Sequence, residues 1–163
     1  MSTTQTLLKT YEFNRNRTLD LLSTIEKMPN PRAVLAWRPG PGRAHIGWQL
    51  MHLGITEEIF ATERLAPEKP AAFVELWPRF RGGSTPDDDV PSVETIRRIL
   101  GESRAHLMET LAGYSDDRLE EIPPGLAARK TTFGTVLQII NWHEAHHHGQ
   151  AHITLNLYRA AHP

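Results

Sequence analysis

The sequence contains no cysteine, which excludes disulfide bonds, cysteine-based zinc sites and cysteine nucleophiles. It also lacks the run of about 18 consecutive apolar residues that a membrane-spanning helix needs. Residues 1–25 do not contain the short apolar run of a secretory signal, so we expect a cytoplasmic protein without a membrane partner. If the protein uses a thiol in its chemistry, that thiol must come from another molecule.

The chain has no excess of either charge. Eighteen Lys and Arg residues face 19 Asp and Glu residues, which gives a formal net charge of −1. No run of like charges is long enough to create a strongly charged surface, so we do not expect nucleic acid as a partner. With 163 residues, 39% of them hydrophobic, the chain is long enough to bury one continuous core. We therefore predict a single domain over residues 1–163.

Proline and glycine divide the chain into long segments with helical periodicity. We expect Ser92 to cap the third segment and Thr132 to cap the fourth. No segment alternates apolar and polar residues as a half-buried strand would. The sequence therefore predicts an all-α fold, an up-down four-helix bundle with a long crossover between helices 2 and 3. The four helices are expected over residues 3–27, 44–65, 93–111 and 133–160.

The crossover itself, residues 66–91, contains five prolines and the pair Gly82-Gly83. Within it, Phe73, Trp77 and Phe80 recur at helical spacing and predict a short amphipathic turn. A loop of this length is often functional, so one interpretation is a lid or a wall of a substrate site. The other interpretation is a surface flap whose aromatic side chains cover the core.

Histidine is the unusual component, since five of the nine histidines lie between His143 and His152. On a helical wheel the core-facing direction falls close to His143, and His147 lies about 40° away on the same face. His148 and His152 fall at about 140° and 180°, on the opposite side. Two neutral imidazoles four residues apart on one helix face can bind the same cation. The pattern therefore indicates a metal-binding pair at His143 and His147.

A third ligand is available in the second helix. His52 lies between apolar neighbours, and burying an imidazole costs free energy unless its ring nitrogens find partners. Together, His52, His143 and His147 would form a three-nitrogen site with open coordination positions, which is typical of catalytic metal. The other ring nitrogens need acceptors, and the candidates are Asn14, Thr18, Glu57 and Glu144.

Simpler interpretations remain open for the same residues. A buried histidine such as His52 can be an ordinary hydrogen-bonded core residue, and the histidine cluster can be a solvated face. His148 and His152 can also form an adventitious metal pair on the surface. For the remaining histidines we expect core or surface positions without a metal, and these are His45, His106 and His162.

Three motifs resemble the DinB/YfiT-like family of metalloenzymes, and the resemblance covers the whole order of helices. They are Leu50-Met51-His52-Leu53, the Thr-capped Phe133-Gly134-Thr135-Val136-Leu137, and His143-xxx-His147-x-Gly149-Gln150. The resemblance implies a four-helix bundle with a three-histidine site for zinc or nickel, and a homodimer. It places the ligands at His52, His143 and His147. The additional His45, His146 and His148 depart from the pattern and leave open which metal is bound.

The resemblance also implies a class of chemistry, because characterised relatives are transferases and isomerases that use thiols such as bacillithiol or mycothiol. Our first hypothesis is a metal-dependent transferase that activates an external low-molecular-weight thiol toward a small-molecule substrate. Arg15, Arg43 or the segment Phe73–Phe80 would orient the substrate. A second hypothesis is a hydrolase that uses metal-bound water, with Glu57 or Glu144 as the base. A third is a non-catalytic, metal-binding dimeric bundle.

Overall fold

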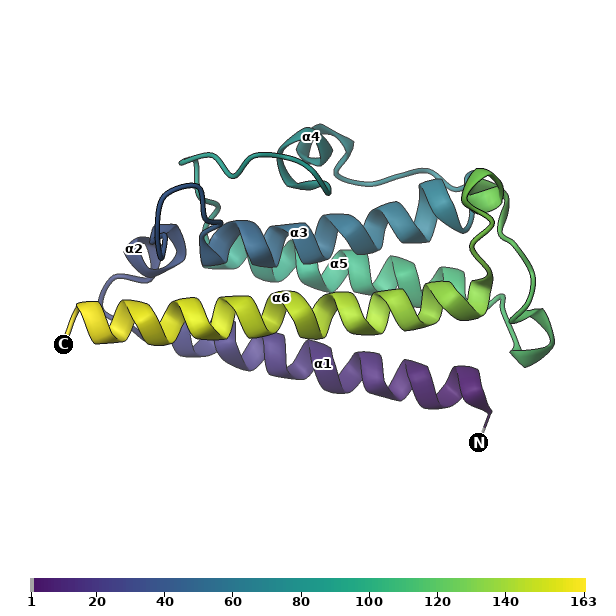
Figure 1. The fold of residues 1–163 in the computed structure, drawn as a ribbon, viewed down its shortest axis with the longest axis horizontal. Helices are drawn as coiled ribbons and strands as arrows, with labels where there is room; N and C mark the ends of the chain where they lie inside the picture. Colours follow the sequence, from purple (N-terminus) through teal and green to yellow (C-terminus); the bar gives the residue numbers. More distant parts are fainter. Residues whose placement is uncertain (1) are drawn as a thin grey trace.

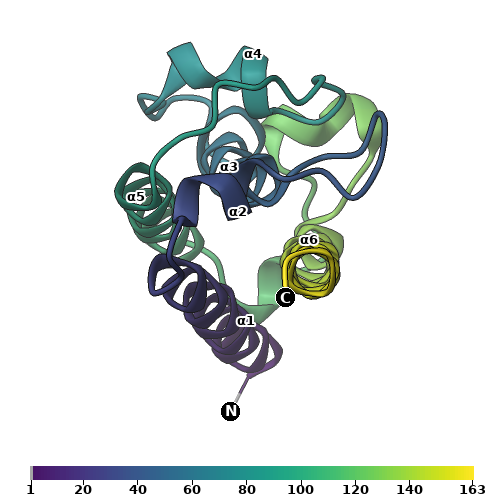
Figure 2. The same cartoon turned by 90° about the vertical axis from the view of Figure 1, so that its left-hand side faces the viewer.

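The structure, a computed structural model, describes residues 2–163. Within these residues it contains helices and no strand, so the prediction of an all-α fold is confirmed. The long helices lie side by side along the molecule (Figure 1), with the crossover and its short helix α4 placed over α3 (Figure 2). Their bounds are Thr3–Glu26 for α1, Ile46–Ile59 for α3, Val93–Leu111 for α5 and Phe133–Ala161 for α6.

Hydrogen bonds between the long helices show their relative directions. Along α1 and α6, the Tyr11 hydroxyl donates to the Leu137 carbonyl at 2.5 Å. Further along both helices, Arg15 Nε donates to Glu144 Oε1 at 2.7 Å. The residue numbers therefore rise together, and α1 and α6 are parallel, as the colours in Figure 1 also show.

The helices α3 and α5 form the second parallel pair. Gly54 of α3 lies against Ile99 of α5. Further along, Arg104 of α5 donates to Glu57 of α3 at 3.1 Å. The long helices thus run up, down, down and up, which differs from the simple alternation of an up-down bundle. The physical reason is the crossover, which carries the chain back to the end where α3 begins.

The second predicted helix, residues 44–65, differs from the structure at both ends. It begins at Ile46 because His45 serves as its N-cap, with its side chain accepting a hydrogen bond from the Trp48 backbone amide. After Ile59 the chain continues as a π-helix, η1, over Phe60–Arg64. The hydrogen bond from Leu65 N to Phe60 O, 3.1 Å long, closes this wider turn.

A short helix that the sequence analysis did not expect, α2 over Pro31–Ala36, follows α1. Proline is expected to separate the helical segments here, but Pro31 occupies the first helical position, where a missing N–H costs nothing. Asn30 caps this helix by accepting from the Ala33 amide at 3.1 Å. α1 therefore ends at Glu26, and Asn30 and Pro31 then begin α2.

The crossover contains the predicted amphipathic turn as two short helices, η2 over Val74–Leu76 and α4 over Trp77–Phe80. Phe80 is 1% exposed and belongs to the core, and Phe73 and Trp77 pack against that core. These aromatic side chains cover the core, as the second interpretation of the crossover proposes. Two further 3-10 helices, η3 over Asp116–Arg118 and η4 over Pro124–Arg129, lie between α5 and α6.

Four buried charged residues separate two apolar clusters of the core. Leu22, Leu50 and Leu100 belong to one cluster, and Tyr11 and Phe133 belong to the other. Between them each long helix contributes one charged side chain, and these are Arg15, Glu57, Arg104 and Glu144. None of the helices within residues 2–163 combines the length and apolar character that crossing a bilayer requires.

Candidate metal centre

The crossover and a neighbouring tryptophan hold His52 in the middle of α3. Its Nδ1 donates a hydrogen bond to the carbonyl oxygen of Phe80 at 2.6 Å, since a carbonyl can only accept. The indole of Trp48 stacks on the imidazole with ring centroids 4.6 Å apart. Trp48 is itself held by donating from Nε1 to the carbonyl of Arg79 at 3.1 Å. These contacts orient the ring and leave Nε2 as the nitrogen without a proton.

The other two imidazoles come from α6 and face His52. The Nε2 atoms of His143 and His52 are 3.0 Å apart. His147 donates from Nδ1 to the side-chain oxygen of Gln49, which leaves its Nε2 without a proton. One ring nitrogen from each histidine lies within 4.8 Å of the other two. The structure therefore brings together the three residues that the sequence analysis selected.

Burial keeps these three imidazoles neutral. It lowers the pKa of His143 to about 3, and the neighbouring His52, His146 and Arg64 groups disfavour protonation of His143 as well. Burial also lowers the pKa of His147 to about 3, with a further contribution from His143. The pKa of His52 is lowered by burial too, although its hydrogen bond to Phe80 opposes the shift. Neutral imidazoles are the form that binds a metal.

The donor set fits a divalent cation such as zinc or nickel, both of which accept imidazole ligands. Two nitrogens bound to a tetrahedral zinc lie about 3.4 Å apart, close to the 3.0 Å between the His52 and His143 Nε2 atoms. The second nitrogens of His52 and His147 donate to oxygen acceptors, as is usual for histidine ligands. Three protein ligands leave a position for substrate, so the cluster could hold a catalytic metal.

The helical wheel placed the buried face of α6 too close to His143. Glu144 and Leu155 are each 2% exposed, whereas Leu157, which falls about 40° from His143 on the wheel, is 47% exposed. The centre of the buried face therefore lies about 70° from His143, toward Glu144. His143 and His147 lie at the edge of that face, half-buried against α3.

The four residues predicted to accept hydrogen bonds from the ring nitrogens of the histidines do not do so, and these are Asn14, Thr18, Glu57 and Glu144. Glu57 and Glu144 instead accept hydrogen bonds from Arg15 and Arg104 in the buried charge cluster. Burial opposes ionisation of Glu57, but the two guanidinium groups outweigh it and hold the pKa of Glu57 below its ordinary value. Arg15 is likewise engaged in this cluster and is only 6% exposed. Both carboxylates are thus paired with guanidinium groups in the core.

Asn14 and Thr18 also make no hydrogen bond to His52, His143 or His147. Asn14 donates to the Asn141 side-chain oxygen at 2.7 Å, and Thr18 donates to the Asn14 carbonyl at 3.2 Å. The acceptors found in the structure are Gln49 and the backbone of Phe80. Gln49 could have been proposed, because it lies one turn before His52 on the same helix face. The Phe80 carbonyl could not be predicted as an acceptor from the sequence, because every residue has a backbone carbonyl.

The remaining histidines have other surroundings. His148 and His152 lie in the groove between α1 and α6, with ring centroids 6.0 Å apart, and are separate from the cluster. His106 donates to the buried Glu58 carboxylate at 2.9 Å. His45 caps α3 and therefore has a structural role.

The family model described as the DinB superfamily matches residues 10–151, which include all three clustered histidines. Searches of curated proteins and of solved structures gave no match. The matched residues make up most of the chain, and they contain the histidine pattern that the resemblance rested on. The chain belongs to the DinB superfamily.

Proposed function

We propose that this protein is a metal-dependent transferase acting on a small-molecule substrate through an external low-molecular-weight thiol. One observation carries the proposal: three neutral imidazoles from two helices converge, and Phe80 and Gln49 engage the outward nitrogens of two of them. His52, His143 and His147 would hold a zinc or nickel ion. A divalent cation in such a site deprotonates a coordinating thiol and so supplies a nucleophile at neutral pH.

The residues that contact the three histidines orient and cover them in this proposal. Phe80 O and Gln49 Oε1 fix the tautomers of His52 and His147 and direct their Nε2 atoms inward. Trp48 covers one face of the His52 ring and excludes water from it. A low-molecular-weight thiol also fits the reducing cytoplasm as the location.

The buried charge cluster favours the transferase over the hydrolase. The hydrolase hypothesis assigns Glu57 or Glu144 as a base that assists metal-bound water, and both carboxylates are bound to Arg15 and Arg104. A thiol needs no such base, because coordination itself removes its proton. The proposal therefore assigns no protein side chain as base or nucleophile.

Thiol-dependent turnover tests the proposed function. We expect metal-loaded protein to couple bacillithiol or mycothiol to an electrophile such as 1-chloro-2,4-dinitrobenzene faster than the uncatalysed reaction. Chelation and His143→Ala should each remove this acceleration, while His152→Ala should retain it. Hydrolysis of 4-nitrophenyl acetate at the same rate with and without thiol, in the absence of any thiol coupling, would contradict the transferase and favour the hydrolase.

A further inference from the structure

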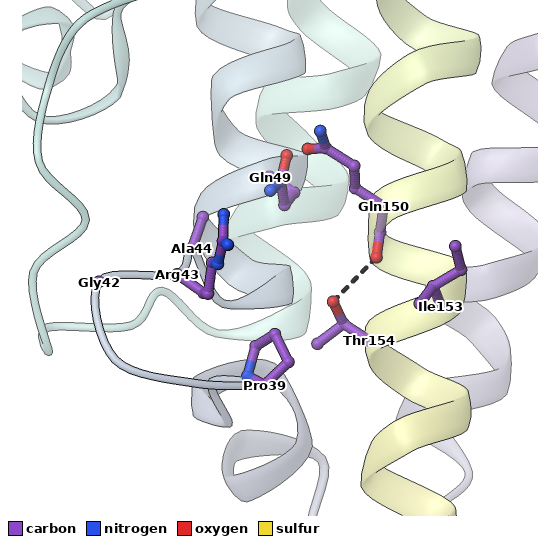
Figure 3. A pocket seen from close by; sticks show the side chains of 8 residues that line it. All are labelled: Pro39, Gly42, Arg43, Ala44, Gln49, Gln150, Ile153 and Thr154. Atoms are coloured by element: carbon purple, nitrogen blue, oxygen red, sulfur yellow. Dashed lines mark hydrogen bonds between the residues drawn. The ribbon is translucent and has the colours of Figure 1, made fainter.

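A cavity of about 380 Å³ lies next to the metal centre, between α3, α6 and the loop that precedes α3. This volume falls within the lower part of the range typical of small-molecule sites, about 300–1,000 Å³. Figure 3 shows Gln150 reaching from α6 toward Gln49 of α3, with Arg43 on the loop beside them. The other residues that line the cavity are Pro39, Gly42, Ala44, Ile153 and Thr154.

The loop that forms one wall of this cavity is anchored. Arg38 donates to the carbonyl of Arg43 at 2.9 Å and to the carbonyl of Pro86 in the crossover at 3.0 Å. Gly42 adopts a φ of 69°, which a residue with a side chain rarely tolerates. The backbone of Arg43 is thus held while its guanidinium extends into the cavity.

Two hydrogen-bond donors in the cavity have no partner within residues 2–163. The guanidinium of Arg43 makes no ion pair and no hydrogen bond, although most arginines of the chain contact a carboxylate. Gln49 uses its side-chain oxygen for His147, and its amide nitrogen donates to no other group. No acidic side chain lines the cavity, whereas Pro39 and Ile153 supply apolar surface.

Gln49 connects this cavity directly to the metal centre. It lines the cavity with one side of its amide and accepts from His147 Nδ1 with the other. Only 7% of the residue is exposed, so its position is fixed by packing. A molecule bound in the cavity would therefore lie beside a residue that orients a metal ligand.

We propose that this cavity binds a carboxylate, with Arg43 and the Gln49 amide nitrogen as donors, and that the substrate class is small organic acids with an apolar portion. The proposal rests on the proposed function for the role of the bound acid, but not for its binding. A carboxylate accepts two parallel hydrogen bonds from a guanidinium, which makes Arg43 the residue that determines specificity.

An NMR titration with phenylacetate and its neutral analogue phenylacetamide tests this site. We expect phenylacetate to shift the side-chain resonances of Gln49 and Gln150, and to bind at least about tenfold more tightly than the amide. Arg43→Gln should weaken phenylacetate binding by a similar factor, because it removes the charge and the paired donors. Arg129→Gln, which changes another exposed arginine distant from the cavity, should leave the affinity unchanged.

The titration is performed on metal-loaded protein and again after chelation. Equal affinity in both forms supports a site built from protein side chains. Affinity that depends on metal but not on Arg43, or equal binding of the acid and the amide, would overturn the proposal. If the protein binds no metal but still binds phenylacetate through Arg43, the proposed function is contradicted while the proposed carboxylate site is supported.

The carboxylate belongs either to the substrate or to the thiol, and 3-mercaptopropionate separates the two sources. If the thiol supplies it, Arg43→Gln weakens the binding of 3-mercaptopropionate to metal-loaded protein. If the substrate supplies it, the affinity for this thiol does not change in the variant, while phenylacetate binding is lost. Both results require Arg43 to recognise a carboxylate, and a variant that binds both acids normally contradicts the site.

Discussion

At the N-terminus of α3 a histidine replaces the usual Ser, Thr, Asp or Asn cap. His45 Nδ1 accepts from the Trp48 amide at 3.0 Å, and its Nε2 donates to the Asp87 carbonyl at 2.9 Å. Only the neutral imidazole can do both, since protonation would place a hydrogen on Nδ1. Burial lowers the pKa of His45, Arg38 contributes in the same direction, and the Asp87 carbonyl and carboxylate oppose the shift.

This cap predicts a stability that depends on pH. The unfolded chain takes up a proton on His45 near pH 6.5, whereas the folded chain does so only at lower pH. Unfolding is then accompanied by proton uptake, so stability falls as the pH falls below about 6.5. His45→Asn keeps an acceptor and cannot titrate. In urea unfolding of chelated protein, the variant should lose less stability between pH 7 and pH 5 than the wild type. An identical loss in the two proteins would contradict the assignment.

Among the elements, the four long helices are connected by their buried charges. Glu57 accepts from both Arg15 and Arg104, and Glu144 completes the cluster from α6. The four side chains are 12% exposed or less. Removing one member would leave an uncompensated charge in the core, which is more costly than the loss of a surface ion pair.

Glu57→Gln should therefore lower the free energy of unfolding by about 3–5 kcal/mol. The matched control is Glu26→Gln, which removes the exposed partner of Arg97 and should cost less than about 1 kcal/mol. Chemical denaturation of both variants provides the comparison. Equal losses would mean that the cluster contributes no more than an exposed pair.

The contact between η1 and η4 predicts opposite effects for two glycine substitutions. A Cβ at Gly125 would lie 2.1 Å from the Glu63 carbonyl oxygen, a backbone atom that cannot move alone. Gly101, within α5, has open space around the same position. We expect Gly125→Ala to destabilise by at least about 1–3 kcal/mol and Gly101→Ala to stabilise by about 0.5–1 kcal/mol. Thermal unfolding measures both, and a neutral Gly125→Ala would contradict the close contact.

The sequence predicted the long helices and the histidine trio because both depend on local spacing. The i, i+4 pair on α6 and a lone histidine between apolar residues are visible without the fold. The buried role of Glu144 was not predicted, since a periodicity analysis assigns any carboxylate to the polar face. The Phe80 contact with His52 depends on where a crossover of irregular conformation folds back, and hydrophobic periodicity contains no information about it.

At the scale of the whole molecule, α6 presents apolar side chains on its outer surface. Trp142 is 61% exposed and Ile153 is 62% exposed, and Ile139 and Leu157 extend the same row. We propose that this row is the contact between two copies of the chain in a homodimer, as the family resemblance implies.

In light scattering, Trp142→Asp should shift the protein toward monomer. Phe13→Asp, at an equally exposed residue of α1, is the control, and a wild type that is monomeric at all concentrations would contradict the proposal.

Elemental analysis of untagged protein purified without added metal tests the three-histidine metal centre most directly. We expect close to one divalent ion per chain in the wild type and loss of most of it in His52→Ala and in His147→Ala. His148→Ala and His152→Ala should retain the metal, because His148 and His152 lie in the groove between α1 and α6, away from the three-histidine cluster. Metal that persists without His52 and His147 but disappears without His148 and His152 would contradict the assignment of the centre.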